Sequence, residues 1–219
     1  MINILFVGNS FTFYNDLPGM LTEMAAAAGI EMSASRVLVG GAYLNQYADP
    51  DHERGKMLLE TYPTKKWDYI VLQDQSFNPA NKPEDFFASV EKLCAYMDCG
   101  AKFLFYSTWA YENNTELLCS TGMTYTEMLT ALTSAYRKAA EIHSGIRVPV
   151  GEAFALTGEN CADINVYHPD SKHPSPCGTY LAAYLFCKAI FGELPEESVI
   201  PEGVAAEQCD ALRRIAAQF

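Results

Sequence analysis

Short runs rich in apolar residues recur along the chain, and most end at a glycine or a polar residue. Five of them are candidate strands: residues 2–7 (INILFV), 33–39 (SASRVLV), 68–73 (DYIVLQ), 101–108 (AKFLFYST) and 146–151 (IRVPVG). Runs of this length are typical of strands buried on both faces of a parallel sheet. The last run gives the weakest prediction, because Pro149 has no backbone N–H to donate to a neighbouring strand.

Longer segments with apolar residues at helical spacing lie between and after these runs. The predicted helices cover residues 17–29, 83–99, 124–143, 178–191 and 205–217. The first has Asp16 as a cap, Pro18 in its first turn and Gly29 as its stop. The fourth is apolar on nearly every side, which is typical of a buried helix.

Strands and helices therefore alternate, and this order predicts parallel strands joined by right-handed crossovers. We expect a three-layer α/β/α sandwich around a five-stranded parallel sheet, similar to flavodoxin. The 219 residues contain no linker, repeat or low-complexity tract, which favours a single domain spanning 1–219. Ligands bind such sheets beyond the carboxyl ends of the strands, so candidate chemistry is sought there.

Composition narrows the possible partners. The chain has 15 basic and 27 acidic residues, a net charge of −12, which argues against nucleic acid. No apolar run approaches the roughly 18 residues of a membrane span. Seven cysteines without CxxC spacing, and a start without a basic leader segment, favour reduced thiols in the cytoplasm. A removed signal peptide would leave the same sequence, and nothing indicates the oligomeric state.

The first candidate for chemistry is GNSFT, residues 8–12, directly after the first strand. A serine there lies on a strand-to-helix turn, where the backbone N–H groups that follow point outward and can bind an anion. Ser10 is thus a candidate nucleophile. Taken alone, the segment favours a simple turn in which Ser10 caps a helix.

The second candidate is DSKHP, residues 170–174. A carboxylate and an imidazole three residues apart can meet across one turn, so that Asp170 holds one ring nitrogen of His173 while the other faces a nucleophile. The alternative is a surface loop in which Asp170 caps a turn and His173 is solvated.

Together, GNSFT near one end and DxxHP near the other resemble blocks I and V of the SGNH (GDSL-like) hydrolases. The resemblance implies the SGNH hydrolase fold and a serine esterase in which Ser10, Asp170 and His173 form the catalytic triad. It implies no cofactor and no metal. The helix after His173 is similar to the closing helix of that family. Asn9 replaces the aspartate of the GDS motif, and Phe11 replaces its leucine.

The resemblance also implies an oxyanion hole built from three donors. They are the Ser10 backbone N–H, the N–H of a glycine after the second strand, and a side-chain amide after the third. Gly40 and Gly41 are both candidates for the glycine, and we choose Gly41. Gln75 stands where the family has the asparagine of GxND, and its amide offers the same donor one methylene further out.

The substrate is less constrained by the sequence. Trp109 and Tyr111 follow the fourth strand and are candidate substrate-binding residues, although an ordinary buried aromatic pair is equally consistent with their positions. The polar segment 110–122 is a candidate loop over the site. We expect a small-molecule ester, with carbohydrate acetyl esters as one class that the resemblance implies. Lipase, thioesterase and acyl-transfer activities are equally compatible with the sequence. The alternative function is a non-catalytic flavodoxin-like binding module with a degenerate oxyanion hole.

The remaining histidines and one nearby cysteine have simpler interpretations. His168 is expected to be a solvated loop residue, and His52 and His143 to be surface residues on helical segments. Cys177 is close to His173 in sequence but is expected to be a small buried residue rather than a nucleophile. The spacing of the four histidines predicts no zinc site.

Overall fold

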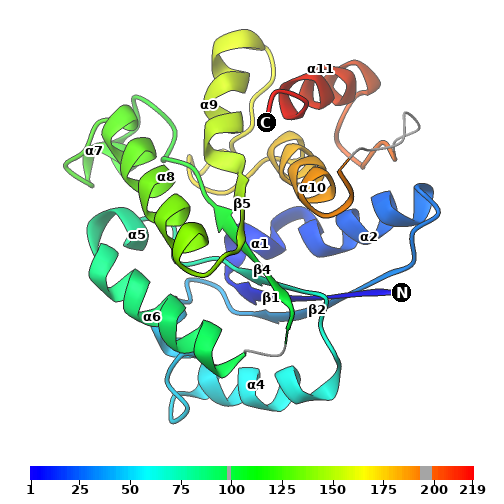
Figure 1. The fold of residues 1–219 in the computed structure, drawn as a ribbon. Coiled ribbons are helices and arrows are strands. Elements are labelled where there is room, and N and C mark those ends of the chain that lie inside the picture. Colours follow the sequence, from blue (N-terminus) through cyan, green and yellow to red (C-terminus); the bar gives the residue numbers. More distant parts are fainter. Residues whose placement is uncertain (98–99, 193–198) are drawn as a thin grey trace.

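The structure, a computed structural model, describes residues 1–97, 100–192 and 199–219. Its sheet has the strand order β2-β1-β3-β4-β5, and all four pairings are parallel (Figure 1). The strands are β1 (Ile2–Gly8), β2 (Met32–Leu38), β3 (Tyr69–Leu72), β4 (Lys102–Ser107) and β5 (Ile146–Pro149). The predicted five-stranded parallel sheet is therefore confirmed, with strand ends that shift by one or two residues.

The five predicted helices are present in the structure. They are α2 (Leu17–Ala27), α6 (Pro83–Tyr96), α8 (Tyr125–Ile142), α10 (Pro176–Phe191) and α11 (Ala206–Ala216). The predicted end of the second helix, at residue 99, lies outside the described residues. The described residues also form six α-helices that were not predicted: α1 (Ser10–Phe13), α3 (Leu44–Tyr47), α4 (Glu53–Thr61), α5 (Asn78–Asn81), α7 (Glu116–Cys119) and α9 (Val150–Asn160).

The predicted fifth strand is wrong at its carboxyl end. The strand stops at Pro149, whose ψ of 56° is not extended, and Val150 begins α9. Gly151 lies in the first turn of that helix, where an added Cβ would come 2.3 Å from the carbonyl oxygen of Thr108. The close contact between α9 and the segment after β4 therefore requires glycine at position 151. In the sequence, this glycine at the end of the apolar run 146–151 resembled the end of a strand.

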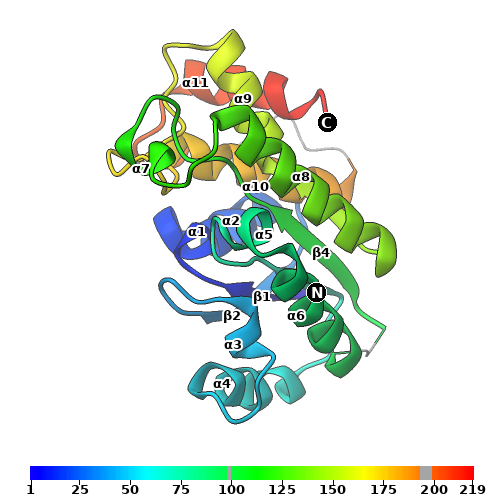
Figure 2. The same cartoon turned by 90° about the vertical axis from the view of Figure 1, so that its left-hand side faces the viewer.

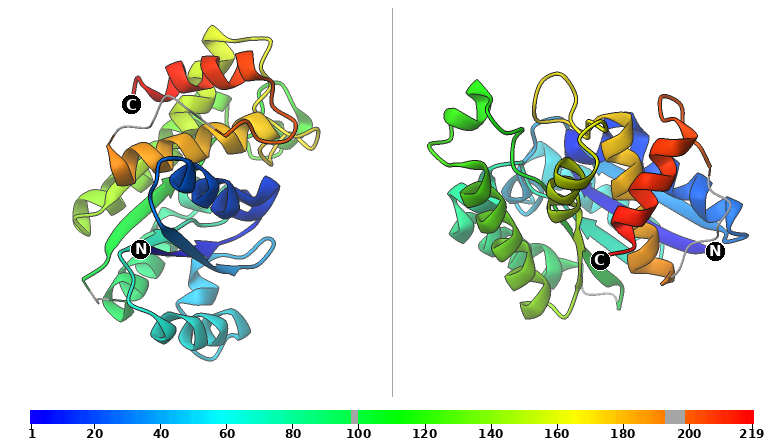
Figure 3. Two further views of the ribbon diagram at one scale, coloured as in Figure 1. Left: turned by 90° about the vertical axis from the view of Figure 1, so that its right-hand side faces the viewer. Right: turned by 90° about the horizontal axis from the view of Figure 1, so that it is seen from above.

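Successive residues of β1, β3 and β4 contribute to two separate cores, as expected for a sheet covered on both faces. Ile4 and Phe6 of β1 pack with α2 and α10, whereas Leu5 and Val7 pack with α3, α4 and α6. Figure 2 shows the sheet between these two helix layers. Helix α8 contributes to both cores, and α11 lies on the outer side of α9 and α10 (Figure 3).

The order of the strands determines which loops meet at the carboxyl edge. β1 lies between β2 and β3, with Gly8 opposite Leu38 and Val7 opposite Leu72. The segments that follow these three strands therefore lie next to one another. They begin at residues 9, 39 and 73, and they include the candidate nucleophile and both candidate oxyanion segments.

Candidate active site

The turn after β1 presents Ser10 at the carboxyl edge. Asn9 has an extended backbone and caps the short helix α1, because its Oδ1 accepts a hydrogen bond from the N–H of Phe11 at 3.0 Å. Ser10 is the first residue of that helix and is partly exposed. Gly8, two residues before Ser10, packs closely on β3: an added Cβ would lie 2.6 Å from Oε1 of the buried Gln73. The capping role proposed as an alternative for Ser10 therefore belongs to Asn9.

The segment before α10 forms a tight reversal that carries the acid and the base. The N–H of His168 donates to the carbonyl of His173 at 2.8 Å, and Ser171 adopts a left-handed φ of 63° at the tip. Oδ1 of Asp170 accepts from the N–H groups of Lys172 at 3.2 Å and His173 at 3.0 Å. These bonds orient the Asp170 carboxylate toward the ring of His173.

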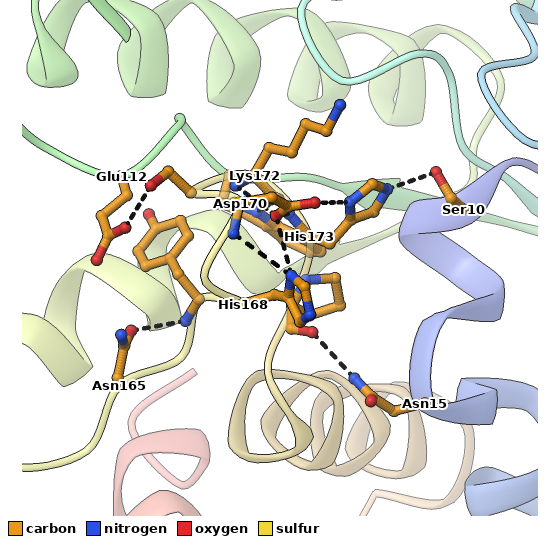
Figure 4. Close-up of polar contacts among 12 residues, drawn as sticks. Ser10, Asn15, Glu112, Asn165, His168, Asp170, Lys172 and His173 are labelled. Carbon is orange, nitrogen blue, oxygen red and sulfur yellow. Dashed lines mark hydrogen bonds and ion pairs between the residues drawn. The ribbon is translucent and has the colours of Figure 1, made fainter. Parts of the chain in front are cut away.

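Asp170, His173 and Ser10 form one hydrogen-bonded series (Figure 4). Oδ2 of Asp170 lies 2.5 Å from Nδ1 of His173, and Nε2 of His173 lies 2.8 Å from Oγ of Ser10. The carboxylate partner assigns the proton of the neutral ring to Nδ1, which leaves Nε2 to accept from the serine hydroxyl. This arrangement can remove the serine proton as the oxygen attacks an electrophile.

The charge of Asp170 is supported by its surroundings. Burial raises the pKa of this carboxyl, but hydrogen bonds from the His173 ring and from the backbone N–H groups of His173 and Lys172 outweigh it. The net effect holds the pKa of Asp170 well below its usual value. The carboxylate therefore stays ionised at neutral pH and can stabilise an imidazolium at His173.

Two aromatic rings fix the plane of the imidazole. Tyr14 stacks on His173 with a centroid distance of 4.1 Å and an interplanar angle of 8°, and Phe11 contacts it edge-on at 5.5 Å. Only 13% of the His173 side chain is exposed. Sequence reasoning did not single out Tyr14, although its position four residues after Ser10 was a signal.

The loop 168–174 is also tied to two other segments. Asn15, which has a left-handed φ of 50°, donates from Nδ2 to the carbonyl of Pro174 at 3.0 Å. Oγ of Ser171 donates to Glu112 at 2.8 Å, and both bonds appear in Figure 4. Glu112 belongs to the predicted loop 110–122, which in the structure contacts the acid–base segment through this residue. These contacts were not predicted, since they join segments far apart in the chain.

The structure corrects the prediction for Trp109. Its ring has 0% exposed surface and lies between Phe11, at 4.7 Å, and Phe154, at 4.3 Å. Nε1 donates to the carbonyl of Lys172 at 2.9 Å. A substrate cannot contact this ring in the described conformation. Trp109 instead supports the nucleophile turn on one face and the acid–base loop through its N–H.

Tyr111 has a different position from Trp109. It is 6% exposed, and its hydroxyl lies 2.7 Å from Oγ of Ser76, next to Gln75. Burial raises the pKa of the Tyr111 hydroxyl, and hydrogen bonds with Ser76 and Gln75 offset part of that rise. Direct substrate binding by Tyr111 stays a prediction.

The candidate oxyanion donors come from three adjacent segments. In the first turn of α1, the N–H groups of Phe11 and Thr12 donate to Asn9, whereas the Ser10 N–H makes neither of these bonds. Gly41 is exposed and has a φ of 66° in a turn that the Ala42 N–H closes onto Val39. In Gln75, Nε2 donates to Oγ of Ser76 at 3.0 Å and Oε1 accepts from the Phe77 N–H at 3.1 Å. The same side chain also hydrogen-bonds the Tyr111 hydroxyl.

We expect Gln75→Ala to lower kcat more than it raises KM. An oxyanion donor acts on charge that develops in the transition state, and loss of one donor typically costs about 10²–10³ in rate. Steady-state kinetics on an activated acetyl ester will measure the change. Asn160→Ala, on the exposed end of α9, is the matched control. A change confined to KM would assign Gln75 to substrate binding instead.

Other candidate residues lie apart from this series. His168 is 41% exposed, and its Nδ1 lies 3.4 Å from Asp170, away from Ser10. His52 caps α4, whereas His143 is only 16% exposed and lies 3.5 Å from Glu91, so it is less of a surface residue than expected. Cys177 is buried, as predicted.

Two further results concern metals and membranes. Within the described ranges, no three His, Cys, Asp or Glu side chains gather closely enough to hold a metal ion. Across the same described residues, none of the helices combines the length and apolar character needed to cross a membrane. The six described cysteines are free thiols.

Comparison with protein families and with curated proteins found no match. Solved structures are similar over most of the chain. A putative SGNH hydrolase from Slackia heliotrinireducens shares 29% identity with a TM-score of 0.76, covering 86% of this chain and 98% of its own. A DUF4886 family protein from Bacteroides uniformis shares 22% identity with a TM-score of 0.84, covering 99% and 93%. An acetylxylan esterase from Geobacillus stearothermophilus shares 14% identity with a TM-score of 0.65, covering 90% and 97%.

Proposed function

Because the chain has the SGNH (GDSL-like) hydrolase fold, we propose that it is a serine esterase with Ser10, His173 and Asp170 as its catalytic triad. The observation that carries the proposal is the continuous hydrogen-bonded series from Asp170 through His173 to Ser10. It lies at the carboxyl edge of a parallel sheet, where α/β proteins bind their ligands. Similarity to hydrolases of the same fold supports the reaction class.

The proposed reaction proceeds in two acyl-transfer steps. His173 takes the proton of Ser10 as Oγ attacks the ester carbonyl carbon, and the carbonyl oxygen becomes an oxyanion. The Ser10 and Gly41 N–H groups and the Gln75 amide stabilise that oxyanion. His173 then gives its proton to the alcohol oxygen as the C–O bond breaks. Water, deprotonated by His173, attacks the acyl-enzyme and releases the acid together with free Ser10.

A polar substrate is favoured by the surroundings of Gln75. A cavity of about 390 Å³ opens beside this residue, between the segments that follow β2 and β3. Amide side chains form much of its lining: Asn45, Gln46, Gln75, Asn78 and Asn81. Such a lining can hydrogen-bond hydroxyl groups but offers little to a long acyl chain. We therefore propose a short-chain ester of a polar alcohol, and acetylated carbohydrates are the class that the similar acetylxylan esterase supports.

The proposal is tested with p-nitrophenyl esters of increasing chain length, acetylated xylo-oligosaccharides and a fluorophosphonate probe. We expect covalent labelling at one residue, turnover of the acetyl ester, and a decline in kcat/KM as the acyl chain lengthens. A protein that neither turns over these esters nor labels would be the non-catalytic binding module. Turnover that increases with chain length would refute the polar short-chain substrate and keep the esterase.

A further inference from the structure

Three buried polar side chains connect the three segments at the carboxyl edge. Asn9 is 2% exposed, and Gln73 and Asp74 are each 0% exposed. A buried polar group destabilises the fold unless it is hydrogen-bonded, so its partners identify what it does. Each of these side chains bonds to a segment other than its own.

Asn9 and Gln73 anchor the nucleophile turn. Nδ2 of Asn9 donates to the carbonyl of Ala42 at 2.9 Å, which joins this turn to the segment after β2. Oε1 of Gln73 accepts from the Asn9 N–H and from the Thr12 hydroxyl, both at 2.9 Å, which joins the turn to the end of β3. The segment after β1 is thereby joined both to the segment after β2 and to the end of β3.

Asp74 makes the third connection, between the segments after β2 and β3. Its Oδ1 accepts from the N–H of Leu44 at 2.8 Å and from the N–H of Gln75 at 2.7 Å. Its Oδ2 accepts from Nδ2 of Asn78 at 2.7 Å. One oxygen therefore holds the start of α3, three residues after Gly41, together with the backbone of Gln75.

We propose that Asp74 is a positioning residue for the oxyanion hole, which holds the Gly41 segment and Gln75 at a constant separation. This inference rests on the proposed esterase function. A transition-state donor must be held to within a fraction of an ångström, and hydrogen bonds to a buried carboxylate are stronger than bonds between neutral groups. Asp74 does not touch the substrate and acts only through its neighbours.

The surroundings of Asp74 agree with a positioning role. Burial raises the pKa of its carboxyl, and hydrogen bonds from Asn78, Leu44 and Gln75 offset only part of that rise. Among the ion pairs formed by the described residues, none includes Asp74. Its partners are instead two backbone N–H groups and one amide, all of which belong to the segments that it joins.

We expect Asp74→Ala to lower kcat about tenfold or more, with little change in KM, when rates are expressed per probe-titrated active site. Asp74→Asn keeps an acceptor for Leu44 and Gln75, and Asn78 can turn its amide oxygen toward the new NH₂ group. This conservative variant should recover most of kcat. Thr157→Ala is the matched control, because Thr157 is also a buried polar side chain but bonds to Ala153 within α9, so its loss should keep kcat close to that of the wild type.

A double-mutant cycle with Gln75→Ala separates positioning from simple stabilisation. If Asp74 acts through Gln75, the kcat losses of Asp74→Ala and Gln75→Ala are less than multiplicative in the double variant. Fully multiplicative losses would overturn the inference, as would an unchanged kcat per active site in Asp74→Ala. If Asp74→Ala does not fold, Asp74→Ser carries the same expectation. A wild-type protein that the probe does not label would instead refute the proposed esterase.

Discussion

Replacing Ser10 with alanine is expected to abolish ester turnover and covalent labelling by a fluorophosphonate. The Ser10 hydroxyl is the group that His173 faces at 2.8 Å, and alanine has no atom that can attack a carbonyl carbon. Loss of the nucleophile in serine hydrolases costs about 10⁶ in kcat. We therefore expect a residual rate no more than about 10³–10⁴ above the uncatalysed reaction, which the oxyanion hole and substrate binding still supply.

The fold should survive this change. The first turn of α1 is capped by Asn9 and not by Ser10, and alanine is the best helix-forming residue. Circular dichroism and thermal melting will measure fold and stability alongside the activity. Ser33→Ala is a matched control, since Ser33 lies near the amino end of β2, at the opposite edge of the sheet. Labelling of Ser10→Ala at the wild-type rate would show that another residue is the nucleophile.

Activity is expected to rise with pH and then to level, and replacement of His173 or Asp170 should nearly remove it. Only the neutral imidazole can accept the Ser10 proton, so activity appears as His173 loses its own proton. Histidine side chains ordinarily change charge over roughly pH 5–8. Asp170 cannot account for this limb, because its pKa is held well below the usual range and the carboxylate is already ionised.

The His173→Ala and Asp170→Asn variants should lose activity for different reasons. His173→Ala removes the base and should reduce kcat to nearly that of Ser10→Ala. Asp170→Asn keeps the base but loses its orientation and its charge partner, a change that costs about 10⁴ in comparable triads.

Rates against pH, with active sites titrated, will test this prediction. His168→Ala is the matched control, because His168 also lies beside Asp170 but away from Ser10. Its removal should leave the rise of activity with pH unchanged. A wild-type profile that is flat from about pH 5 to 9 would exclude His173 as the base.

Acid unfolding is a separate effect from the loss of activity at low pH. The depressed pKa of Asp170 means that its stabilising effect is present above the ordinary carboxyl pKa of about 3.9 and is lost as pH falls below it. That loss occurs at lower pH than histidine titration. Thermal melts recorded across the same pH range will therefore separate the two effects.

Several features of the fold could be predicted because their signals are local. Apolar runs such as 2–7 and 68–73 are long enough to identify buried strands, and their alternation with helices leaves few topologies. Helices α4 and α9 were not predicted, because their local apolar signal is weak. The first buries only Gly55 and Leu58, and the second contains Gly151 and Gly158, so neither has a strong apolar period.

The candidate site also combines residues that local motifs identify with contacts that only folding creates. Ser10, Asp170 and His173 could be chosen from two short motifs, because the chemistry of each residue and its position after a strand or within a tight turn are encoded locally. The structure brings these motifs, about 160 residues apart, within hydrogen-bonding distance. Their catalytic role, and the oxyanion role of Gly41 and Gln75, stay predictions for the variants above to test.

The sequence by itself therefore determined the five strands and the five helices that have a clear apolar pattern, the edge of the sheet where the candidate site lies, and the residues with suitable chemistry. Only the tertiary structure decided that Trp109 is buried between Phe11 and Phe154, that Tyr14 stacks on His173, and that Asp74 joins two loops. The physical reason is the range of the interactions. Periodicity and turn preferences depend on neighbours in the chain, whereas burial and the partners of a buried polar group depend on segments that meet only after folding.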